Sequence, residues 1–521
     1  MKKLTALFIV LAFSLMLFGG CASNQTDNDT AAQGDGSGSV TDNEDSQRDD
    51  LVIAFNNKIA NYDPYSSTLS ESGYLNSMLF DTVAAYTGFG SEIELRLATD
   101  YAVSEDGLSW TFNLRDDVVF HDGTPLTSND VKVSVEAIMA SPYKGSGYEN
   151  FESVEVTGDH QFILHTKTYD AETLGRFNEI WIVQGDLYTE QGAEAYAQNL
   201  IGTGAFSLES QDPASGNMIL KSNADYWDGE PQIKQIEIRY ITEASTRVVA
   251  LEKGEVDLLT TAYTTDYETL SQNSELQVLT YPASSSWSYL IFNTTQAPCD
   301  NRTFRQAIAY ALDYETISLI ATGGVGTVVN SVFYKEDYGY ELPEVQTYTY
   351  DPEKAMELLS QAGITTPYDL GTVQVIGNQK TTLEYIQQNL AAVGVNFEIE
   401  QVEGATYVNG LSGGNFIISY MPNASLGTTP ATAYKSLFTT GNANNFSRYS
   451  NSEVDELVAS MENRRDDSQM EEYVGRLVQI VQEDVPMVNL HHISNILAAD
   501  KDLHVELGGS NKYVFRDFYW E

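Results

Sequence analysis

The 521-residue chain is strongly acidic, since 74 aspartates and glutamates against 28 lysines and arginines give a formal net charge of −46 at pH 7. This length exceeds what one hydrophobic core organises, so two or three lobes are expected. The negative charge excludes nucleic acid and anionic lipid headgroups as favourable partners. The 32 tyrosines combine an apolar ring with a hydroxyl group, which suits both ligand pockets and ordinary cores.

The N-terminus has the pattern of an export signal. Two lysines precede an apolar run at residues 4–18, which is followed by Gly-Gly-Cys21. A positive start, a short apolar run and small residues predict a secretory signal peptide at residues 1–21. The run is shorter than the roughly 20 residues that span a bilayer. Its ending resembles a bacterial lipobox, which implies that Cys21 becomes lipidated.

The next segment, residues 22–50, is rich in Ser, Asn, Asp, Gln and Gly. It has too little apolar surface to order itself, so we expect a flexible tether. After lipidation Cys299 is the remaining thiol. One thiol makes no internal disulfide, and we expect this cysteine to be buried and inert.

The folded part begins with a predicted strand at residues 51–55. The sequence Asn-Tyr62-Asp-Pro predicts a turn, and residues 71–87 are expected to form a helix. Further along, Asp106-Gly107 predicts a turn before an alternating strand at residues 109–114, and residues 118–121 are expected to form the returning strand.

A capped helix follows this hairpin. Thr127 and Asp130 have the spacing of a capping box. The apolar residues Val131, Val135 and Ile138 fall on one helical face.

These stretches carry a family resemblance. SEDGLSWTFNLR and VVFHDGTPLTSNDV resemble the signature of family 5 extracellular solute-binding proteins, the capture subunits of ABC importers for peptides, nickel chelates and related solutes. Four later segments are similar to the same family: LIGTGAFSL, NADYWDGEP, STRVVALEKGEVDLL and FSRYSNSEVDELV.

The resemblance implies an α/β fold of the periplasmic-binding-protein type II, with two large lobes, a hinge and a small inserted section. Lobe I is expected at residues 51–85, 200–292 and 486–521. The inserted section, lobe II, is expected at residues 86–199, and lobe III at residues 293–485.

The glycines of LIGTGAFSL are expected to permit close backbone approach in a bend. Trp227 is expected to anchor a turn. Residues 236–240 predict a strand and residues 244–253 a helix, while residues 287–293 predict a short strand.

A helix capped by Asp300 or Asn301 follows, and its Arg302 and Arg305 are expected to be structural. Asp351-Pro352 predicts the start of another helix. Helix and strand are expected at residues 382–393 and 395–402.

No catalytic motif stands out. The chain contains neither a G-x-S-x-G nor an H-E-x-x-H sequence. His491 and His492 are adjacent, so on a strand their side chains point to opposite faces and do not easily bind one metal ion together. One of the two could still face a cleft between the lobes. We therefore expect a binding protein and no enzyme, with no cofactor and no metal site.

The binding residues are expected where relatives line the inter-lobe cleft. Peptide-binding relatives use an aspartate of the last lobe for the peptide ammonium, but residues 415–441 contain no Asp or Glu. Neutral groups there suit an uncharged, capped or chelated solute, and Glu179 is an alternative counter-charge. The candidate ligand-binding residues are Tyr62, Glu179, Trp181, Trp287, Tyr420, Asn423, Ser425, Thr429 and Tyr434.

The expected function is therefore that of a lipid-anchored subunit at the cell surface or in the periplasm, capturing a peptide or peptide-like solute. Its expected partners are an ABC permease and ATPase and, through the lipid, the membrane; we expect a monomer without nucleic acid. A nickel or metallophore carrier, a surface sensor without transport and a secreted enzyme remain as alternatives.

Overall fold

The structure is a computed structural model that describes residues 48–87, 92–329, 331, 346–377, 379–425, 429–466, 468–508 and 513–521, without the side chains of 282–286 and 422–425. The expected signal peptide, Cys21 and all of the expected tether before residue 48 lie outside these residues. No helix in the described ranges is long and apolar enough to cross a membrane.

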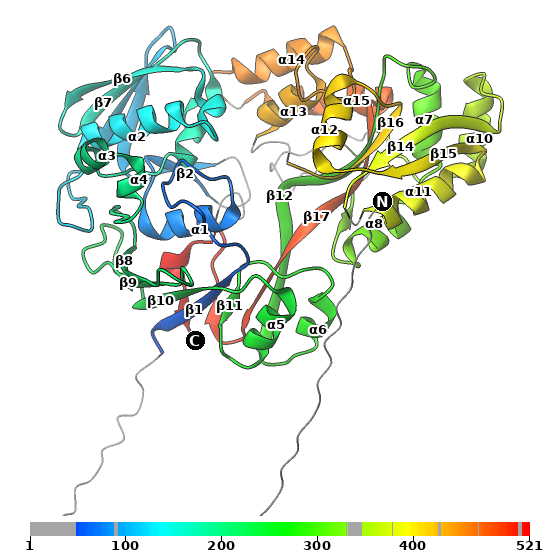
Figure 1. Cartoon of the computed structure of the whole chain (residues 1–521). Helices are drawn as coiled ribbons and strands as arrows, with labels where there is room; N and C mark the ends of the chain where they lie inside the picture. Colours follow the sequence, from blue (N-terminus) through cyan, green and yellow to red (C-terminus); the bar gives the residue numbers. More distant parts are fainter. Residues whose placement is uncertain are drawn as a thin grey trace, which may run out of the picture. The chain divides into compact units, whose positions relative to one another are not determined.

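A nine-stranded sheet forms the centre of the described part of the chain (Figure 1). Its order is β16-β12-β17-β11-β1-β10-β9-β8, and β13 pairs with β17. β1 runs parallel to β10 and β11. The strands are β1 (Asp50–Phe55), β8 (Phe206–Gln211), β9 (Met218–Ser222), β10 (Gln235–Tyr240), β11 (Leu258–Leu259), β12 (Leu276–Phe292), β13 (Thr327–Val328), β16 (Ile418–Ser425) and β17 (Met487–Asp500).

The two long strands β12 and β17 connect two groups of elements. They pair antiparallel from Leu276 opposite Asp500 to Ile291 opposite Met487. One end of β17 pairs with β11, and the other half of β12 pairs with β16. The strand predicted at residues 287–293 is therefore the end of a longer element, and Figure 1 shows both strands running between the two groups.

A second sheet has the order β4 (Ala98–Val103), β5 (Ser109–Leu114), β7 (Gln161–Thr166) and β6 (Phe151–Gly158). The buried positions of β5 alternate as predicted. Its hairpin partner across the Asp106-Gly107 turn is β4, which precedes it. The returning strand predicted at residues 118–121 is wrong, since that segment makes only the isolated bridge between Val119 and Pro125.

Helix α2 (Ser128–Ala140) covers this second sheet and confirms the predicted cap. Thr127 and Asp130 form the reciprocal capping box, and the predicted inner face is fully buried. The same group contains β2 (Ala84–Tyr86), β3 (Ile93–Leu95), α3 (Gly185–Gln191), α4 (Ala193–Tyr196) and the short 3-10 helices η1 (Gly145–Tyr148), η2 (Ala171–Thr173) and η3 (Gly175–Glu179).

Helix α1 (Ser70–Leu79) is shorter than predicted, because the backbone becomes extended at Phe80, before β2 begins. The carbonyl of Leu79 accepts from the amide of Gly204 at 3.0 Å instead of continuing the helix. A Cβ at Gly202 would stand 1.9 Å from the oxygen of Leu79, and one at Gly204 would stand 2.4 Å from its carbonyl carbon. The predicted close backbone approach at these glycines is confirmed.

Trp227 is held between two arginines. The guanidinium groups of Arg96 and Arg115 lie 4.6 Å and 4.5 Å from its ring centre. Its Nε1 donates to the carboxylate of Asp81 at 3.0 Å. The predicted anchoring role of Trp227 is confirmed, because these contacts tie its turn to the residues that directly follow β3 and β5 and to the segment after α1.

The described part of the chain begins at Arg48, and the tether expected to reach residue 50 is wrong for its last three residues, because Arg48 makes tertiary contacts and Asp50 already belongs to β1. The Arg48 guanidinium makes two hydrogen bonds to the buried carboxylate of Asp257, at 2.8 Å and 2.7 Å, and stacks 4.2 Å above the Trp520 ring. Nearby lie α5 (Ala244–Glu252), α6 (Tyr267–Ser271), β18 (Leu503–His504), η5 (Phe515–Asp517) and β19 (Tyr519–Trp520).

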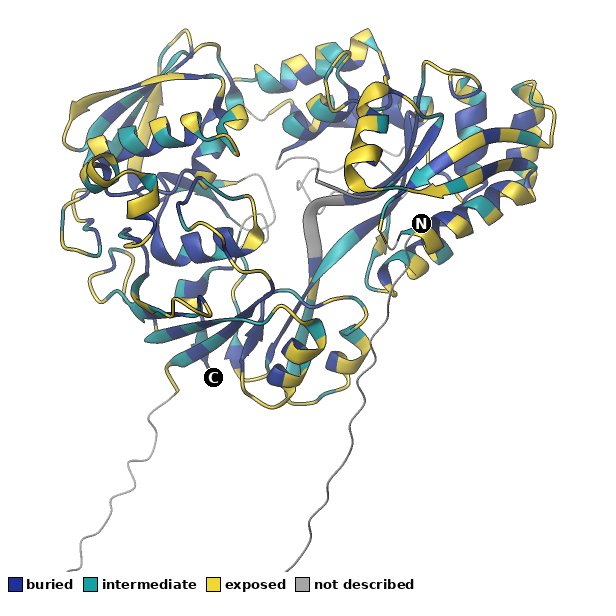
Figure 2. Ribbon diagram, in the orientation of Figure 1, coloured by how far each residue is buried: buried dark blue, intermediate teal, exposed yellow. Residues whose placement is uncertain are grey.

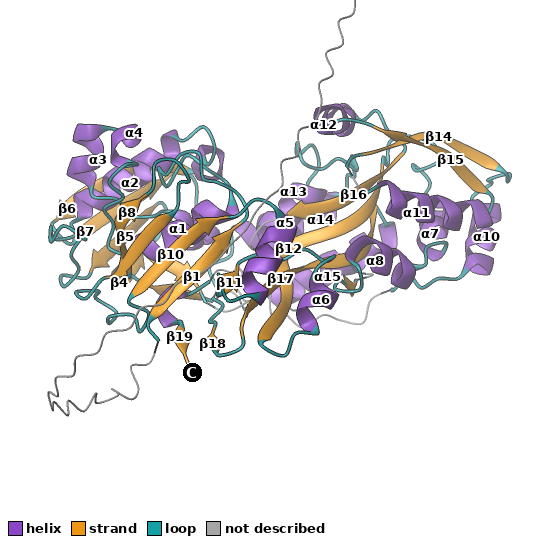
Figure 3. Cartoon of the chain, turned by 60° about the horizontal axis from the view of Figure 1, so that its bottom comes forward, coloured by secondary structure: helices purple, strands orange, loops and turns teal. Residues whose placement is uncertain are grey.

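The remaining helices surround β16 and the parallel pair β14 (Tyr368–Val375) and β15 (Val395–Gln401) (Figure 3). Asn301 caps α7, and Asp351 caps α10 with Pro352 in its first turn, as predicted. These helices are α7 (Arg302–Tyr310), α8 (Tyr314–Thr322), α10 (Pro352–Gln361), α11 (Lys380–Ala392), α12 (Gly404–Gly413), α13 (Pro430–Phe438), α14 (Ser452–Glu462) and α15 (Met470–Asp484).

Buried residues follow the strands and the inner faces of these helices (Figure 2). Arg305 is buried among them and donates to the carbonyls of Cys299, Asp484 and Val485. Arg302 pairs with Glu483 at 2.9 Å. The structural role predicted for both arginines is confirmed. Cys299 is buried as predicted, and burial raises the pKa of its thiol.

Candidate functional site

A cavity of about 640 Å³ opens beside α1, within the range of volumes that hold drug-sized ligands. Most of its wall comes from three segments: the start of α1 with the loop before it, the loop that includes η1, and the region of η2 and η3. Thr432 of α13 and Asn495 of β17 complete it from other parts of the chain. The lining residues are Ser67, Thr68, Leu69, Ser70, Gly73, Tyr74, Tyr86, Tyr143, Lys144, Ser146, Gly147, Tyr148, Glu172, Gly175, Arg176, Asn178, Glu179, Trp181, Thr432 and Asn495.

The wall of the cavity is aromatic and hydroxyl-rich. Four tyrosines and Trp181 contribute rings, and three serines contribute hydroxyl groups. Only glycine fits at position 175 of this wall, since a Cβ there would stand 2.0 Å from the Tyr86 hydroxyl oxygen. The Trp181 carbonyl accepts a hydrogen bond from the Tyr65 hydroxyl at 2.5 Å, which fixes the backbone at the wall. Such walls suit a solute with both apolar and polar groups.

The charged residues of the cavity are paired with opposite charges. Lys144 Nζ lies 3.7 Å from Glu179 Oε2. Arg176 donates from Nε and Nη2 to the carboxylate of Asp170, at 3.2 Å and 2.8 Å, and from Nη1 to the carbonyl of Gly147 at 2.8 Å. The charges of the cavity are therefore offset in pairs, but the Lys144–Glu179 pair, unlike that of Arg176, is too long for a hydrogen bond.

Glu172 joins the cavity to a contact between segments far apart in the chain. Its carboxylate accepts from Arg464 Nη1 at 2.7 Å, across 292 positions of sequence. The Tyr169 hydroxyl donates to the Arg464 carbonyl at 2.5 Å, and the Arg465 guanidinium lies 3.9 Å above the Tyr169 ring. We call Tyr169, Glu172, Arg464 and Arg465 the clasp.

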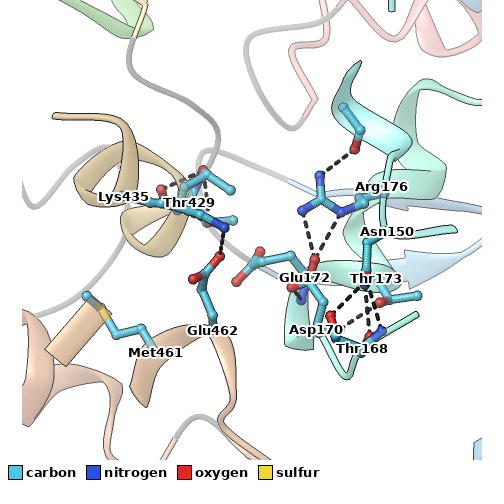
Figure 4. Close-up of polar contacts among 12 residues, drawn as sticks. Asn150, Thr168, Asp170, Glu172, Thr173, Arg176, Thr429, Lys435, Met461 and Glu462 are labelled. Atoms are coloured by element: carbon cyan, nitrogen blue, oxygen red, sulfur yellow. Dashed lines mark hydrogen bonds and ion pairs between the residues drawn. The ribbon is translucent and has the colours of Figure 1, made fainter. Parts of the chain in front are cut away.

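The clasp places a buried carboxylate beside the cavity. Burial raises the pKa of Glu172, and the neighbouring Arg464 partly offsets that rise. Figure 4 shows Glu172 extending from its turn towards the helices that carry Thr429 and Glu462, while Asp170 beside it holds Arg176.

The structure brings together only part of the predicted set of site residues. Glu179 and Trp181 both line the cavity. Tyr62 lies at a separate depression of about 890 Å³ formed with residues around β8. The side chains of Asn423 and Ser425 lie outside the described residues.

The other predicted site residues are buried in packing contacts. Thr429 caps α13 through its side chain. Trp287 packs edge-on against the His492 ring, with 6.2 Å between ring centres. Tyr420 accepts from the hydroxyl of Ser288 at 3.1 Å, and Tyr434 stacks with Phe438.

Sequence reasoning missed most of the wall. Its tyrosines, Lys144 and Arg176 were not singled out, nor was Thr432. The stretch from Tyr143 to Tyr148 carries a usable signal, because it places two aromatic rings and a cation around two glycines in a short loop.

The adjacent histidines lie in β17 and are both buried. Burial lowers the pKa of His491 to about 4, with a smaller contribution from His492. His491 is therefore neutral at neutral pH. Neither histidine is among the residues that line the cavity.

Two α/β groups joined by long strands, with a wide aromatic cavity, define a protein that binds small solutes. Within the described ranges, no three His, Cys, Asp or Glu residues are grouped so as to hold a metal ion. The cavity has the composition of a recognition site.

Comparison with known proteins identifies the family. The model of bacterial extracellular solute-binding proteins, family 5, matches residues 92–445, so the chain belongs to this family. It is 28% identical over 382 residues to the glutathione-binding protein GsiB of Salmonella typhimurium, covering 68% of this chain and 70% of the relative. It is 24% identical over 550 residues to the oligopeptide-binding protein AppA of Bacillus subtilis, covering 99% and 98%.

The fold has solved counterparts. The structure of HbpA2 from Haemophilus parasuis superposes with a TM-score of 0.83 at 23% identity, covering 91% of this chain and all of that one. The predicted α/β fold of the periplasmic-binding type is thereby confirmed, as is the family resemblance.

Proposed function

We propose that the chain captures a short peptide or peptide-like solute in the cavity beside α1 and delivers it unchanged to the permease of an ABC importer. The observation that supports this proposal most directly is the aromatic, hydroxyl-rich cavity of about 640 Å³ in a member of an extracellular solute-binding family. Relatives named for glutathione and oligopeptide binding support a peptide-like solute.

In this proposal Glu179 and Trp181 contact the solute, together with the tyrosines of the wall. Movement of the α13 side towards the α1 side closes the cavity, which expels water and strengthens polar contacts inside it. The long strands β12 and β17 serve as the hinge, since they link the two groups. The lobe boundaries expected from the sequence are part of the same proposal.

The function is tested by releasing and identifying whatever co-purifies with the protein. We expect denaturation followed by mass spectrometry to reveal peptides or peptide conjugates in roughly stoichiometric amount. The refolded, emptied protein should gain thermal stability when they are returned, because a ligand that binds only the folded state stabilises it. Recovery of a nickel complex would favour the metal-chelate alternative, and conversion of the returned solute would reveal an enzyme.

Membrane attachment through Cys21 is a separate part of the proposal. The support is the sequence of residues 1–21, with its lysines, apolar run and Gly-Gly-Cys ending. We expect Cys21→Ala to move the protein from the membrane fraction to the supernatant, since lipid anchoring then fails. Cys299→Ala is the matched control and should stay with the membrane. Membrane association of Cys21→Ala that persists after high-salt washing would contradict lipidation.

A further inference from the structure

Two cations line the cavity, Lys144 and Arg176, and they differ in how far acceptors of the described residues use their hydrogen-bonding capacity. The Arg176 guanidinium is occupied by Asp170 and by the Gly147 carbonyl. Lys144 differs. Its nearest acidic oxygen belongs to Glu179 and lies 3.7 Å from Nζ, beyond hydrogen-bond distance. Among the described residues, no acceptor lies within hydrogen-bond distance of the Lys144 ammonium.

This ammonium is largely buried, with its side chain only 15% exposed. An ammonium carries three donors, and leaving donors without acceptors in a closed site is costly. Water serves them while the cavity is open. A solute that displaces this water keeps its affinity only if it supplies acceptors of its own.

The surroundings favour an anionic acceptor at this position. The cavity wall also contains Ser70, the first residue of α1, whose N-cap Leu69 provides no side-chain acceptor for the first amides of that helix. The acidic residue of this first turn, Glu71, faces elsewhere and accepts from the backbone and side chain of Asn57. A helix N-terminus and an ammonium both favour negative charge.

The acidic residues that line the cavity are Glu172 and Glu179. Glu172 is held by Arg464, and Glu179 offsets the charge of Lys144 at 3.7 Å without accepting a hydrogen bond from its ammonium. Residues 415–441 contribute no carboxylate at all. The net charge of −46 does not prevent binding of an anionic group, because salt screens charges beyond about 8 Å.

We infer that Lys144 binds a carboxylate of the solute, so that the protein selects peptide-like solutes with a free acid group and tolerates a blocked amino end. This inference rests on the proposed function and specifies its substrate class. Lys144 would then determine specificity by a charge-assisted contact, in which the ammonium donates to the carboxylate oxygens.

The test uses four equimolar tripeptide pools: free acids, C-terminal amides, N-acetylated acids, and N-acetylated amides. The emptied protein is dialysed against each pool, and retained peptides are quantified by mass spectrometry. We expect free acids to be retained roughly ten- to a hundredfold over amides, the range of a charge-assisted hydrogen bond. N-acetylated acids should be retained within about threefold of the free acids, because Glu172 is held by Arg464 and the charge of Glu179 is offset by Lys144, which leaves neither carboxylate to pair with a solute ammonium.

The matched variants are Lys144→Met, Lys144→Arg and Lys132→Met. Lys144→Met should bring the acid-to-amide ratio close to one, and Lys144→Arg should preserve the preference. Lys132 pairs with Glu136 on the exposed side of α2, so Lys132→Met should behave as the wild type. The ratio is informative because a merely structural loss weakens acids and amides alike.

Two results overturn the inference in distinguishable ways. Equal retention of acids and amides by the wild type, or an unchanged preference in a folded Lys144→Met protein, removes Lys144 from solute recognition and leaves peptide capture intact. Failure to retain peptides from any of the four pools overturns the proposed function together with the inference.

Discussion

Replacing Gly73 by tryptophan should abolish solute binding while the protein stays folded. Gly73 lies in α1, lines the cavity, and has no heavy atom within 4 Å of a Cβ built on it. A large side chain at this position therefore occupies cavity space. We expect at least a roughly hundredfold loss of affinity, which is about 3 kcal/mol, measured by calorimetry with the co-purified solute.

The control for this experiment is Gly73→Ala. Glycine within a helix is less favourable than alanine by roughly 0.5–1 kcal/mol, so this variant should be slightly more stable and should bind normally. The substitution Gly147→Trp should block the cavity from another part of its wall, because a Cβ at Gly147 also has no heavy atom within 4 Å. Unchanged affinity in both folded tryptophan variants would show that the solute binds elsewhere.

Local elements were predictable where neighbouring residues decide them. The cap formed by Thr127 and Asp130, and the start of α10 at Asp351-Pro352, depend on contacts within three or four residues. The end of α1 could not be predicted from the local sequence. The Leu79 carbonyl there accepts a hydrogen bond from the amide of Gly204, more than a hundred residues later in the chain. No local pattern contains such a contact.

The cavity escaped prediction for the same reason. Its wall joins segments near Ser67, Tyr143 and Glu172, with Thr432 and Asn495, which approach one another only once both sheets exist. Glu179 and Trp181 were expected from the positions where relatives line the cleft, and both do reach the cavity.

The tyrosines show the limit of reasoning from residue type. A tyrosine suits a core and a binding wall equally well. Tyr420 and Tyr434 are buried in the core, while Tyr74 and Tyr86 line the cavity. Composition indicated aromatic surfaces without saying which rings a solute meets.

The second large effect is expected at the clasp. Arg464 and Glu172 have side chains only 12% and 7% exposed, with 2.7 Å between Nη1 and Oε1. Removing one member of a buried ion pair typically costs about 3–5 kcal/mol, because the other charge stays buried without its partner. We therefore expect Arg464→Met to lower the free energy of unfolding by this amount, measured by urea denaturation.

The double variant separates charge burial from lost packing. Glu172→Gln combined with Arg464→Met leaves no buried carboxylate, so it should recover most of the stability lost in Arg464→Met. Lys435→Met is the control, because Lys435 is half exposed in its pair with Glu462 and should cost no more than about 1 kcal/mol. If the double variant instead loses the sum of both single losses, the two side chains act independently. The clasp would then not hold α14 against the cavity wall through its charges, and the closure of the cavity would depend on the stacking of Arg465 on Tyr169.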